Sequence, residues 1–284
     1  MEENKVLQEL LSYDFNAFVE EKIKLKESIK QIKKELNIII DKGGKTDDKT
    51  TFLISYLITS INTADDIDYL VDWSRQTTIE AMTRVFLENF AEYYQLATKF
   101  TNPTEIQKEI NYLYLREIRR CILSFQRTIS ATSMQNKSDL LKSIKKTVRF
   151  FIDSAFASEI TNIDETDDTL FIQSINNILK TISNDASLID KNRIDLGKRN
   201  GGSDFVSTAL NAIPAYGATG YDGNEILYGI LSETVHANLT ATLSHSQEDG
   251  KFTYVTKNPN IVAIINLLNI VINYMKDILL DLEL

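Results

Sequence analysis

The residues whose types could do chemistry gather in the stretch YGILSETVHANL, residues 228–239. Helical spacing places Tyr228, Ser232 and His236 in one row, because four residues nearly complete a helical turn. A histidine at the edge of an apolar face can act as a general base near neutral pH. It can equally be a hydrogen-bonded structural group where two helices meet. A Ser–His pair is also within reach, but no G-x-S-x-G nucleophile elbow surrounds Ser232.

The sequence predicts neither a metal site nor a cofactor. Its two histidines, His236 and His245, are nine residues apart and fall on different faces of a helix, and no H-E-x-x-H pattern is present. The one cysteine, Cys121, cannot form an internal disulfide, which fits a reducing compartment. We expect Cys121 to fill space on a helix rather than to act as a nucleophile.

A second group of chemically capable residues lies in a segment predicted as one long helix that begins at Thr63 and runs to about residue 100. Arg75 falls within its apolar sector, where a guanidinium group needs a carboxylate or several carbonyl groups. We expect a structural ion pair, an anion-binding arginine in a cleft, or exposure near a helix end or bend. Glu80, Arg84 and Glu88 step by four along a flanking face, which predicts a ladder of ion pairs at the surface or rim.

The two segments together resemble a widespread bacterial family of uncharacterised helical proteins. Its members have an R-x4-E helix early in the chain and a Y-x2-LS-x2-VH segment late. The resemblance covers roughly residues 52–245, and the matching positions are Arg75, Glu80, Tyr228, Leu231, Ser232, Val235 and His236. That family is distantly similar to HEPN helical domains (higher eukaryote and prokaryote nucleotide-binding), many of which are ribonucleases of toxin–antitoxin and antiphage systems.

This resemblance suggests roles for the matched residues and their neighbours. The candidate catalytic residues are His236, Arg75 and Glu80, and the candidate ligand-binding residues are Tyr228, Ser232 and Arg84. HEPN ribonucleases have an R-x4-6-H motif, and here no arginine precedes His236 at that distance. On this interpretation Arg75 or Arg84 supplies the missing positive charge from the long helix. Whether the protein is an enzyme is not decided by the sequence.

Acidic residues outnumber basic ones, with 40 Asp and Glu against 31 Lys and Arg and a formal net charge of −9. This disfavours general nucleic-acid binding, which needs a basic field. Two successive predicted helices nevertheless have basic stripes, whose members are Arg116, Arg119, Arg120 and Arg127, then Lys142, Lys145, Lys146 and Arg149. The stripes are either solvated faces or a local patch for RNA or a nucleotide.

The elements that must position these residues are helices. Only 10 glycines and 3 prolines occur in 284 residues, which favours long uninterrupted helices. The sequence predicts an all-α, multi-helix bundle with at least six substantial helices. Asn102 and Pro103 are expected to start one of them, and the acids of DETDDTLF to start another. Residues 184–221 are expected to form a loop with short helices.

We predict an N-terminal helical arm over residues 1–44 and a helical bundle domain over residues 45–284. Apolar residues at helical spacing mark the arm, and Gly43 and Gly44 end it. The arm either packs on the body or pairs with another copy. The most apolar run, residues 261–275, is shorter than the roughly 20 residues of a membrane-spanning helix and has asparagines along one stripe. We expect a core helix there, no signal peptide, no membrane association and a cytoplasmic location.

Three functions follow as expectations. The first is a soluble, non-enzymatic helical protein that binds a partner or a small anionic ligand, with antiphage defence as one setting. The second is a HEPN-like ribonuclease or toxin effector that uses His236. The third is a structural scaffold for oligomerisation. The expected partners are a protein or a second copy at the N-terminal arm, and RNA or a nucleotide at the basic patch.

Overall fold

The protein is described by a computed structural model over most of its 284 residues. The described residues are 15–42, 47–72, 76–131, 135–156, 163–196, 203–214, 247–248, 251–252 and 260–282. All statements on structure below concern these residues.

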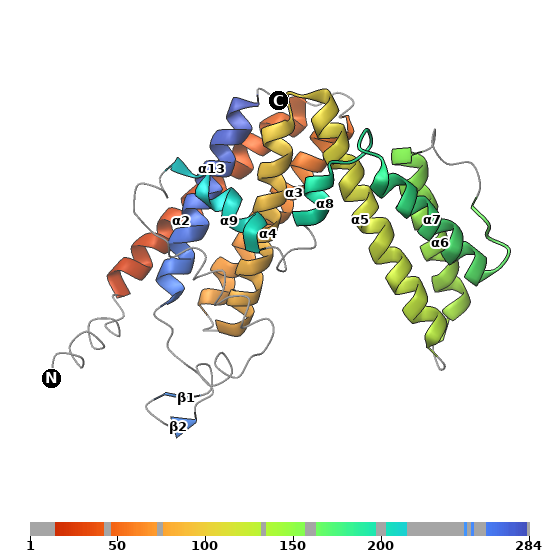
Figure 1. Cartoon of the computed structure of the whole chain (residues 1–284). Helices are drawn as coiled ribbons and strands as arrows, with labels where there is room; N and C mark the ends of the chain where they lie inside the picture. Colours follow the sequence, from red (N-terminus) through yellow and green to blue (C-terminus); the bar gives the residue numbers. More distant parts are fainter. Residues whose placement is uncertain are drawn as a thin grey trace. The chain divides into compact units, whose positions relative to one another are not determined.

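Long helices dominate the described residues (Figure 1). Those of 17 or more residues are α2 (Phe15–Lys42), α3 (Asp48–Val71), α4 (Gln76–Lys99), α5 (Pro103–Ser130), α6 (Lys137–Phe156), α7 (Asp168–Asn184) and α13 (Asn260–Asp281). The shorter elements are α8 (Lys191–Leu196), α9 (Ser203–Asn211), β1 (Gln247–Glu248) and β2 (Lys251–Phe252), and the two strands pair antiparallel. The predicted all-α bundle with at least six substantial helices is confirmed.

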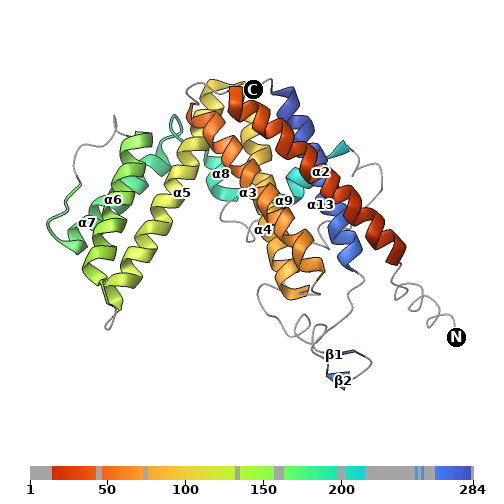
Figure 2. The ribbon, with the colours of Figure 1, turned by 180° about the vertical axis from the view of Figure 1, so that it is seen from behind.

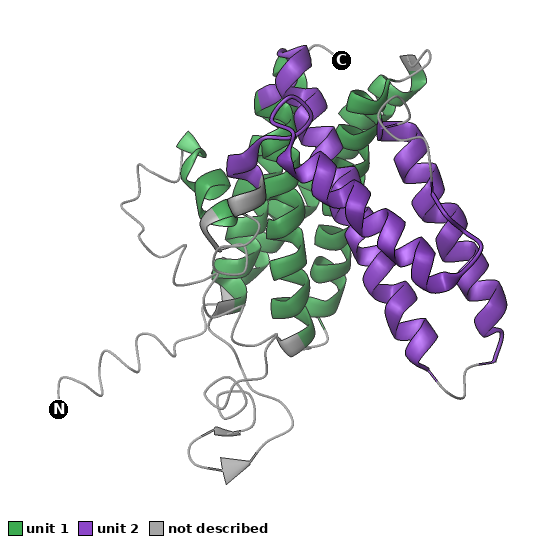
Figure 3. Ribbon diagram, turned by 45° about the vertical axis from the view of Figure 1, so that its right-hand side comes forward, with its two compact units in different colours: residues 1–98, 200–284 green, residues 99–199 purple. Residues whose placement is uncertain are grey.

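The helices group into two compact units (Figure 3). Unit 1 comprises residues 1–98 and 200–284, and therefore holds α2, α3, nearly all of α4, α9, the two strands and α13. Unit 2 comprises residues 99–199, with α5 to α8. This grouping differs from the predicted boundary at residue 44, because α2 packs within unit 1.

Within unit 1, α2 lies along α13 and also contacts α3 (Figure 2). It buries four apolar side chains at helical spacing, namely Leu25, Ile29, Ile32 and Leu36. Full burial of such a side chain contributes about 1.5–3 kcal/mol relative to leaving it exposed. Of the two arrangements expected for the N-terminal segment, α2 therefore shows packing on the body.

A polar contact also joins α2 to α13. Ser28 Oγ donates to Asn269 Oδ1 at 2.6 Å, and Asn273 Nδ2 donates to Ser28 Oγ at 3.0 Å. Two of the three predicted asparagines of the α13 stripe thus face α2, whereas Asn266 is exposed. Part of the predicted polar stripe is therefore an internal hydrogen-bonded contact.

Helix α13 is the one described helix that is long and apolar enough to cross a membrane by length and composition, over Ile261–Asp281. It is longer than the apolar run that the sequence marks. Its residues Ile265, Leu268 and Val271 are fully buried in unit 1, against neighbours that include α2 and α3. These contacts are those of a core helix and are compatible with a soluble protein.

The predicted helix start at Thr63 is wrong, since α3 continues through this residue to Val71 and α4 begins at Gln76. The hydroxyl groups of Ser55, Thr59 and Thr63 each donate to the carbonyl four residues earlier, at 2.7–2.8 Å. A threonine bonded in this way continues a helix instead of capping one. The long helix predicted from residue 63 to about residue 100 therefore combines parts of two separate helices, α3 and α4.

Helix α4 buries most of the apolar sector that helical spacing predicts, because Ile79, Phe86 and Leu96 are fully buried. Val85, which the same spacing places in this sector, is instead 48% exposed. Tyr93 is also fully buried, and its hydroxyl donates to the carbonyl of Met275 at 3.0 Å. This hydrogen bond fixes α4 against α13, and burial raises the pKa of the Tyr93 hydroxyl.

In unit 2 the predicted helix starts at Pro103 and at the acidic segment are confirmed. The Asn102 side chain accepts from the backbone N–H groups of Thr104 and Glu105 at the start of α5. Asp167 caps α7 by accepting from Thr169 N at 2.7 Å. Helix α5 packs extensively on α6 and also contacts α7, where the Phe125 and Phe171 rings lie 5.1 Å apart.

Candidate functional site

Most of the predicted site lies outside the described residues. Arg75, Tyr228, Ser232 and His236 belong to this part of the chain. Their roles and their mutual distances therefore stay predictions. Glu80 and Arg84 are the two predicted site residues that the structure describes.

The predicted surface ladder on α4 is wrong at Glu80, because this residue is buried, at 2% exposed. The pair between Arg84 and Glu88 is confirmed, with Arg84 Nε donating to Glu88 Oε1 at 2.9 Å. Such an i,i+4 pair contributes a few tenths of a kcal/mol, about 0.3–0.5. Arg84 thus pairs within its own helix, while Glu80 is buried, as are Ile79 and Thr83 of the same helix.

The predicted basic stripe on α6 is partly neutralised. Lys145 Nζ lies 2.9 Å from Asp168 Oδ1 and above the Phe171 ring, and Arg149 pairs with Glu165. Both acids belong to the segment that starts α7. Lys142 and Lys146 alone keep exposed positions on α6 without an ion pair to another described residue.

The α5 stripe is also engaged in contacts within unit 2. Arg119 Nη2 donates to Ser183 Oγ at 2.9 Å, and Arg120 pairs with Glu117. A groove at the start of α6 includes Lys137 and Lys142, but Lys137 Nζ already donates to the last carbonyls of α5, at Ile129 and Ala131. These contacts favour the interpretation of the stripes as structural and solvated faces.

Burial and Glu117 both disfavour a reactive thiol at Cys121. The side chain is partly buried, and burial, with a smaller contribution from the Glu117 charge, raises the pKa of the thiol. A raised pKa lowers the fraction of thiolate, which is the nucleophilic form. The structure thus agrees with the expectation that Cys121 fills space.

Unit 2 contains one fully engaged buried carboxylate, Glu109. Arg193 Nε donates to Glu109 Oε1 at 2.7 Å, and Lys99 Nζ donates to Glu109 Oε2 at 3.0 Å. The Arg193 guanidinium also lies 4.3 Å from the centre of the Tyr112 ring. Both carboxylate oxygens are therefore bonded, and the cluster joins α8 to α5 as a structural contact.

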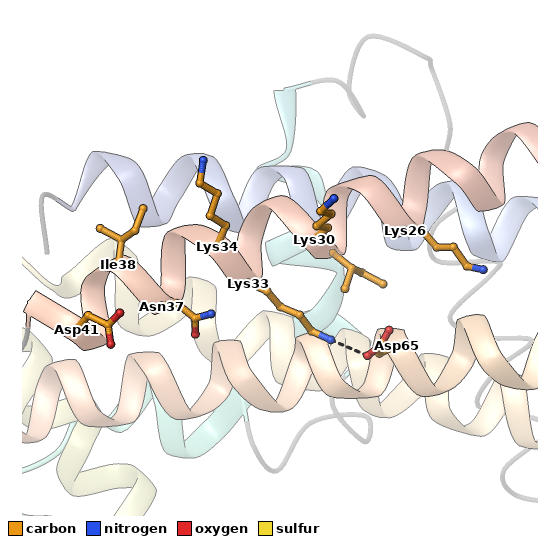
Figure 4. Close-up of a pocket in the computed structure, with 9 residues that line it drawn as sticks. Lys26, Lys30, Lys33, Lys34, Asn37, Ile38, Asp41 and Asp65 are labelled. Atoms are coloured by element: carbon orange, nitrogen blue, oxygen red, sulfur yellow. Dashed lines mark hydrogen bonds and ion pairs between the residues drawn. The ribbon is translucent and has the colours of Figure 1, made fainter.

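The strongest candidate site is an open groove of about 520 Å³ along α2, shown in Figure 4. We call it the α2 groove, and its lining residues are Lys26, Ile29, Lys30, Lys33, Lys34, Asn37, Ile38, Asp41 and Asp65. All of these except Asp65 of α3 belong to α2. Four lysines therefore border one groove in a chain whose net charge is negative.

The lysines of the α2 groove differ in what they contact. Lys33 Nζ lies 2.6 Å from Asp65 Oδ2, as the dashed line in Figure 4 marks. Lys30 and Lys34 form no ion pair with any other described residue, and in Figure 4 they project away from Asp65. Two ammonium groups one helical turn apart thus face solvent at the same groove.

Folding alone does not account for this arrangement. Lys26, Lys30 and Lys34 are spaced four residues apart, and like charges at this spacing destabilise a helix by about 0.2–0.5 kcal/mol per pair. On the other side of α2, Lys24 is by contrast paired with Glu20 and Glu21. Lys30 and Lys34 therefore add a repulsion to α2 that no ion pair with another described residue offsets.

The lysines of the α2 groove are not among the site residues predicted from the sequence. A signal was present, because residues 26, 30, 33 and 34 fall at i, i+4, i+7 and i+8, along one flank of a helix. The contribution of Asp65 was not visible in the sequence. It depends on the packing of α3 against α2.

At one end of the groove, Lys26 also faces a buried carboxylate of α3. Lys26 Nζ lies 3.6 Å from Asp68 Oδ2, and Lys22 Nζ lies 3.8 Å from Asp68 Oδ1. Burial raises the pKa of Asp68, and the charges of Lys22 and Lys26 oppose this rise. Lys26 thus belongs both to the groove and to the α2–α3 contact.

No protein-family model, curated protein or solved structure matches this chain. Among the described residues, no group of three or more His, Cys, Asp and Glu side chains could hold a metal ion. The site is therefore argued from the geometry and charge of the α2 groove.

Proposed function

We propose that this protein is a non-enzymatic binding module that holds an acidic segment of a protein partner in the α2 groove. The observation that carries the proposal is the pair Lys30 and Lys34, which line the groove one turn apart without an ion pair to another described residue. Beside them, Ile38, which is 37% exposed, provides apolar surface in the same groove.

The shape of the groove supports a peptide segment rather than a compact anion. From Lys26 to Lys34 the helix rises about 12 Å, at about 1.5 Å per residue. A phosphate is held best by donors that converge on one point, such as backbone N–H groups or a bidentate arginine. Lysines spread along a helix match carboxylates spread along a partner segment, and Ile38 can contact its apolar side chains.

The distribution of charge supports a short acidic segment over nucleic acid. Residues 99–199 have 16 Lys and Arg against 13 Asp and Glu, a net charge of +3. The remaining residues, which form unit 1, have 15 against 27, a net charge of −12. A long polyanion would extend beyond the groove over this acidic unit and be repelled, whereas a short segment places its charges only in the groove.

We further propose that the protein acts in the cytoplasm, which fits a single cysteine and the burial of α13 in unit 1. The ribonuclease alternative depends on His236 and Arg75, and the scaffold alternative on a second copy. Neither has a supporting contact in the described part of the chain, so both stay predictions.

The test is binding of a fluorescein-labelled synthetic helical peptide that presents glutamates at four-residue spacing beside leucines, measured by fluorescence anisotropy. The double variant Lys30→Gln, Lys34→Gln should weaken binding about tenfold, as expected for two partly exposed ion pairs. The matched control is Lys142→Gln, Lys146→Gln, which removes two unpaired lysines with the same spacing from α6. This control should bind like the unmodified protein.

Two further probes decide between ligand classes. A peptide with glutamine in place of each glutamate should bind weakly, as should inorganic pyrophosphate and a single-stranded oligonucleotide. Equal affinity for the acidic and the glutamine peptide, or an equal loss in both double variants, would contradict the proposed function. If pyrophosphate or the oligonucleotide binds more tightly than the acidic peptide does, the proposed peptide ligand is wrong and the groove is assigned to that ligand instead.

A further inference from the structure

Asp68 is a buried carboxylate whose negative charge lacks close hydrogen-bonded partners. Its residue is 7% exposed, and its Oδ1 atom has no hydrogen-bond partner among the described residues. Lys22 and Lys26 approach it only at 3.8 and 3.6 Å, beyond hydrogen-bond distance. The carboxylate therefore depends on two longer ion pairs for its stability in the charged form.

One of these two cations is engaged elsewhere. Lys22 Nζ donates a hydrogen bond to Asp72 Oδ1, one turn further along α3. The other, Lys26, lines the α2 groove, and its side chain is 58% exposed. The charge that helps to keep Asp68 ionised is thus the same charge that faces a ligand in the groove.

The charged groups around Asp68 are few. From α2 they are Lys22 and Lys26, and Asp72, which directly follows α3, adds a negative charge that acts in the same direction as burial. No described residue of α4 or α13 forms an ion pair with Asp68, and Lys276 of α13 instead donates to Gln31. Lys26 is therefore the charged group near Asp68 that a ligand in the groove can contact and displace.

We propose that binding of an acidic segment in the α2 groove is coupled to the uptake of a proton by Asp68. The inference rests on the proposed function, because it needs an acidic ligand in that groove. A ligand carboxylate beside Lys26 draws the ammonium group away from Asp68 and adds a negative charge nearby. The Asp68 carboxylate then takes one proton from the solvent and becomes a neutral carboxylic acid, with no other bond made or broken.

Thermodynamic linkage gives the direction of the effect. If the ligand favours protonated Asp68, protonation of Asp68 favours the ligand by the same factor. Acidic ligands should therefore bind more tightly as the pH falls through the titration range of Asp68. Lys33 should not produce this effect, because its partner Asp65 is 53% exposed and burial therefore does not disfavour its charged form as it does at Asp68.

The experiment is isothermal titration calorimetry of the acidic peptide in buffers of different ionisation enthalpy. The dependence of the observed heat on the buffer gives the number of protons taken up. From about pH 7.5 to about pH 5, a range above the ordinary glutamate pKa, the unmodified protein should take up protons and bind about threefold more tightly. Asp68→Asn should abolish the uptake, and the matched control Asp66→Asn, at an exposed residue of α3 outside the groove lining, should retain it.

A second variant keeps the test independent of the Asp68 substitution. Lys26→Gln leaves Asp68 in place but removes the shared cation, so its proton uptake should also fall to near zero. Binding with the same proton uptake in the unmodified protein, Asp68→Asn and Lys26→Gln would overturn the coupling and leave the proposed function intact. A failure of every form to bind the acidic peptide would instead overturn the proposed function, and the coupling with it.

Discussion

Two buried carboxylates, Glu109 of unit 2 and Asp68 of unit 1, meet their cations in different ways. Glu109 is bonded at both oxygens, by Arg193 at 2.7 Å and Lys99 at 3.0 Å. Asp68 has only longer ion pairs, and one of its oxygens has no hydrogen-bond partner among the described residues. Both carboxylates are buried, Glu109 more completely than Asp68, and they differ in how closely their cations approach.

This difference indicates which cluster is structural and which can respond to a ligand. The partners of Glu109 are themselves held, since Arg193 is buried and lies on the Tyr112 ring. One partner of Asp68, Lys26, faces an open groove and can be drawn away from it. A carboxylate with both oxygens hydrogen-bonded, such as Glu109, stabilises one arrangement of helices. A carboxylate with an unbonded oxygen next to a groove, such as Asp68, can couple binding to protonation.

The largest expected change in stability comes from a substitution in the Glu109 cluster. Arg193→Met should destabilise unit 2 by about 3 kcal/mol, because it leaves the Glu109 charge buried with one cation fewer. Urea unfolding followed by far-ultraviolet circular dichroism measures the loss. Arg120→Gln, which breaks only the exposed pair with Glu117, is the control and should change stability by less than about 0.5 kcal/mol. A similar small change in both variants would remove the distinction between the two carboxylates.

Asp68→Asn should stabilise unit 1, and by less than Arg193→Met destabilises unit 2. Burial outweighs the two lysines in raising the pKa of Asp68, so the charged form is disfavoured in the folded protein. We expect the variant to be more stable by about 1 kcal/mol at neutral pH. The folded protein binds this proton more tightly than the unfolded chain does, so unmodified protein should approach the variant as the pH falls through the raised pKa.

The measurement for unit 1 is urea unfolding followed by tryptophan fluorescence at several pH values. The single tryptophan of the chain, Trp73, falls in the residue range of unit 1. The stability difference between the unmodified protein and Asp68→Asn should narrow on acidification. An Asp68→Asn variant that is less stable than the unmodified protein at neutral pH, with the unmodified protein losing this advantage on acidification, would show that Lys22 and Lys26 outweigh burial at Asp68.

Asp72→Asn should change stability less, by about 0.5 kcal/mol or below, because the Asp72 side chain is more than half exposed. It should nevertheless alter Asp68. The substitution removes a negative charge that raises the pKa of Asp68 and releases Lys22 from its hydrogen bond. We therefore expect a smaller pH dependence of unit 1 unfolding than in the unmodified protein. An unchanged pH dependence would mean that Lys22 does not exchange between the two acids.

The smallest effect concerns the groove lysines. Lys30→Gln, Lys34→Gln removes two like-charge pairs at i,i+4 spacing, Lys26–Lys30 and Lys30–Lys34. At the low end of about 0.2–0.5 kcal/mol per pair, the variant should stabilise unit 1 by about 0.4 kcal/mol. Lys142→Gln, Lys146→Gln should give a comparable small gain in unit 2. Thermal unfolding of both variants provides the measurement. A clear destabilisation by the groove substitutions would mean that Lys30 or Lys34 has a structural role.

Local chemistry allowed several elements to be predicted from the sequence. An asparagine before a proline predicts the start of α5, and Asp167 and Asp168 mark the start of α7, because capping depends on residues within one turn. The rarity of glycine and proline and the apolar spacing were enough for the all-α class. The chemistry that the sequence marks around His236 lies outside the described residues.

Tertiary packing alone decided which faces are buried and which charges meet. The exposure of Val85 and the burial of Glu80 depend on the helices that surround α4, not on its own spacing. Arg193 reaches Glu109 across 84 positions, and Ser28 reaches Asn269 across 241, so no local pattern could pair them. The sequence by itself determined helices and a row of lysines on α2. The packing of α3 against α2 turned that row into a groove, because it brought Asp65 and the buried Asp68 beside the lysines.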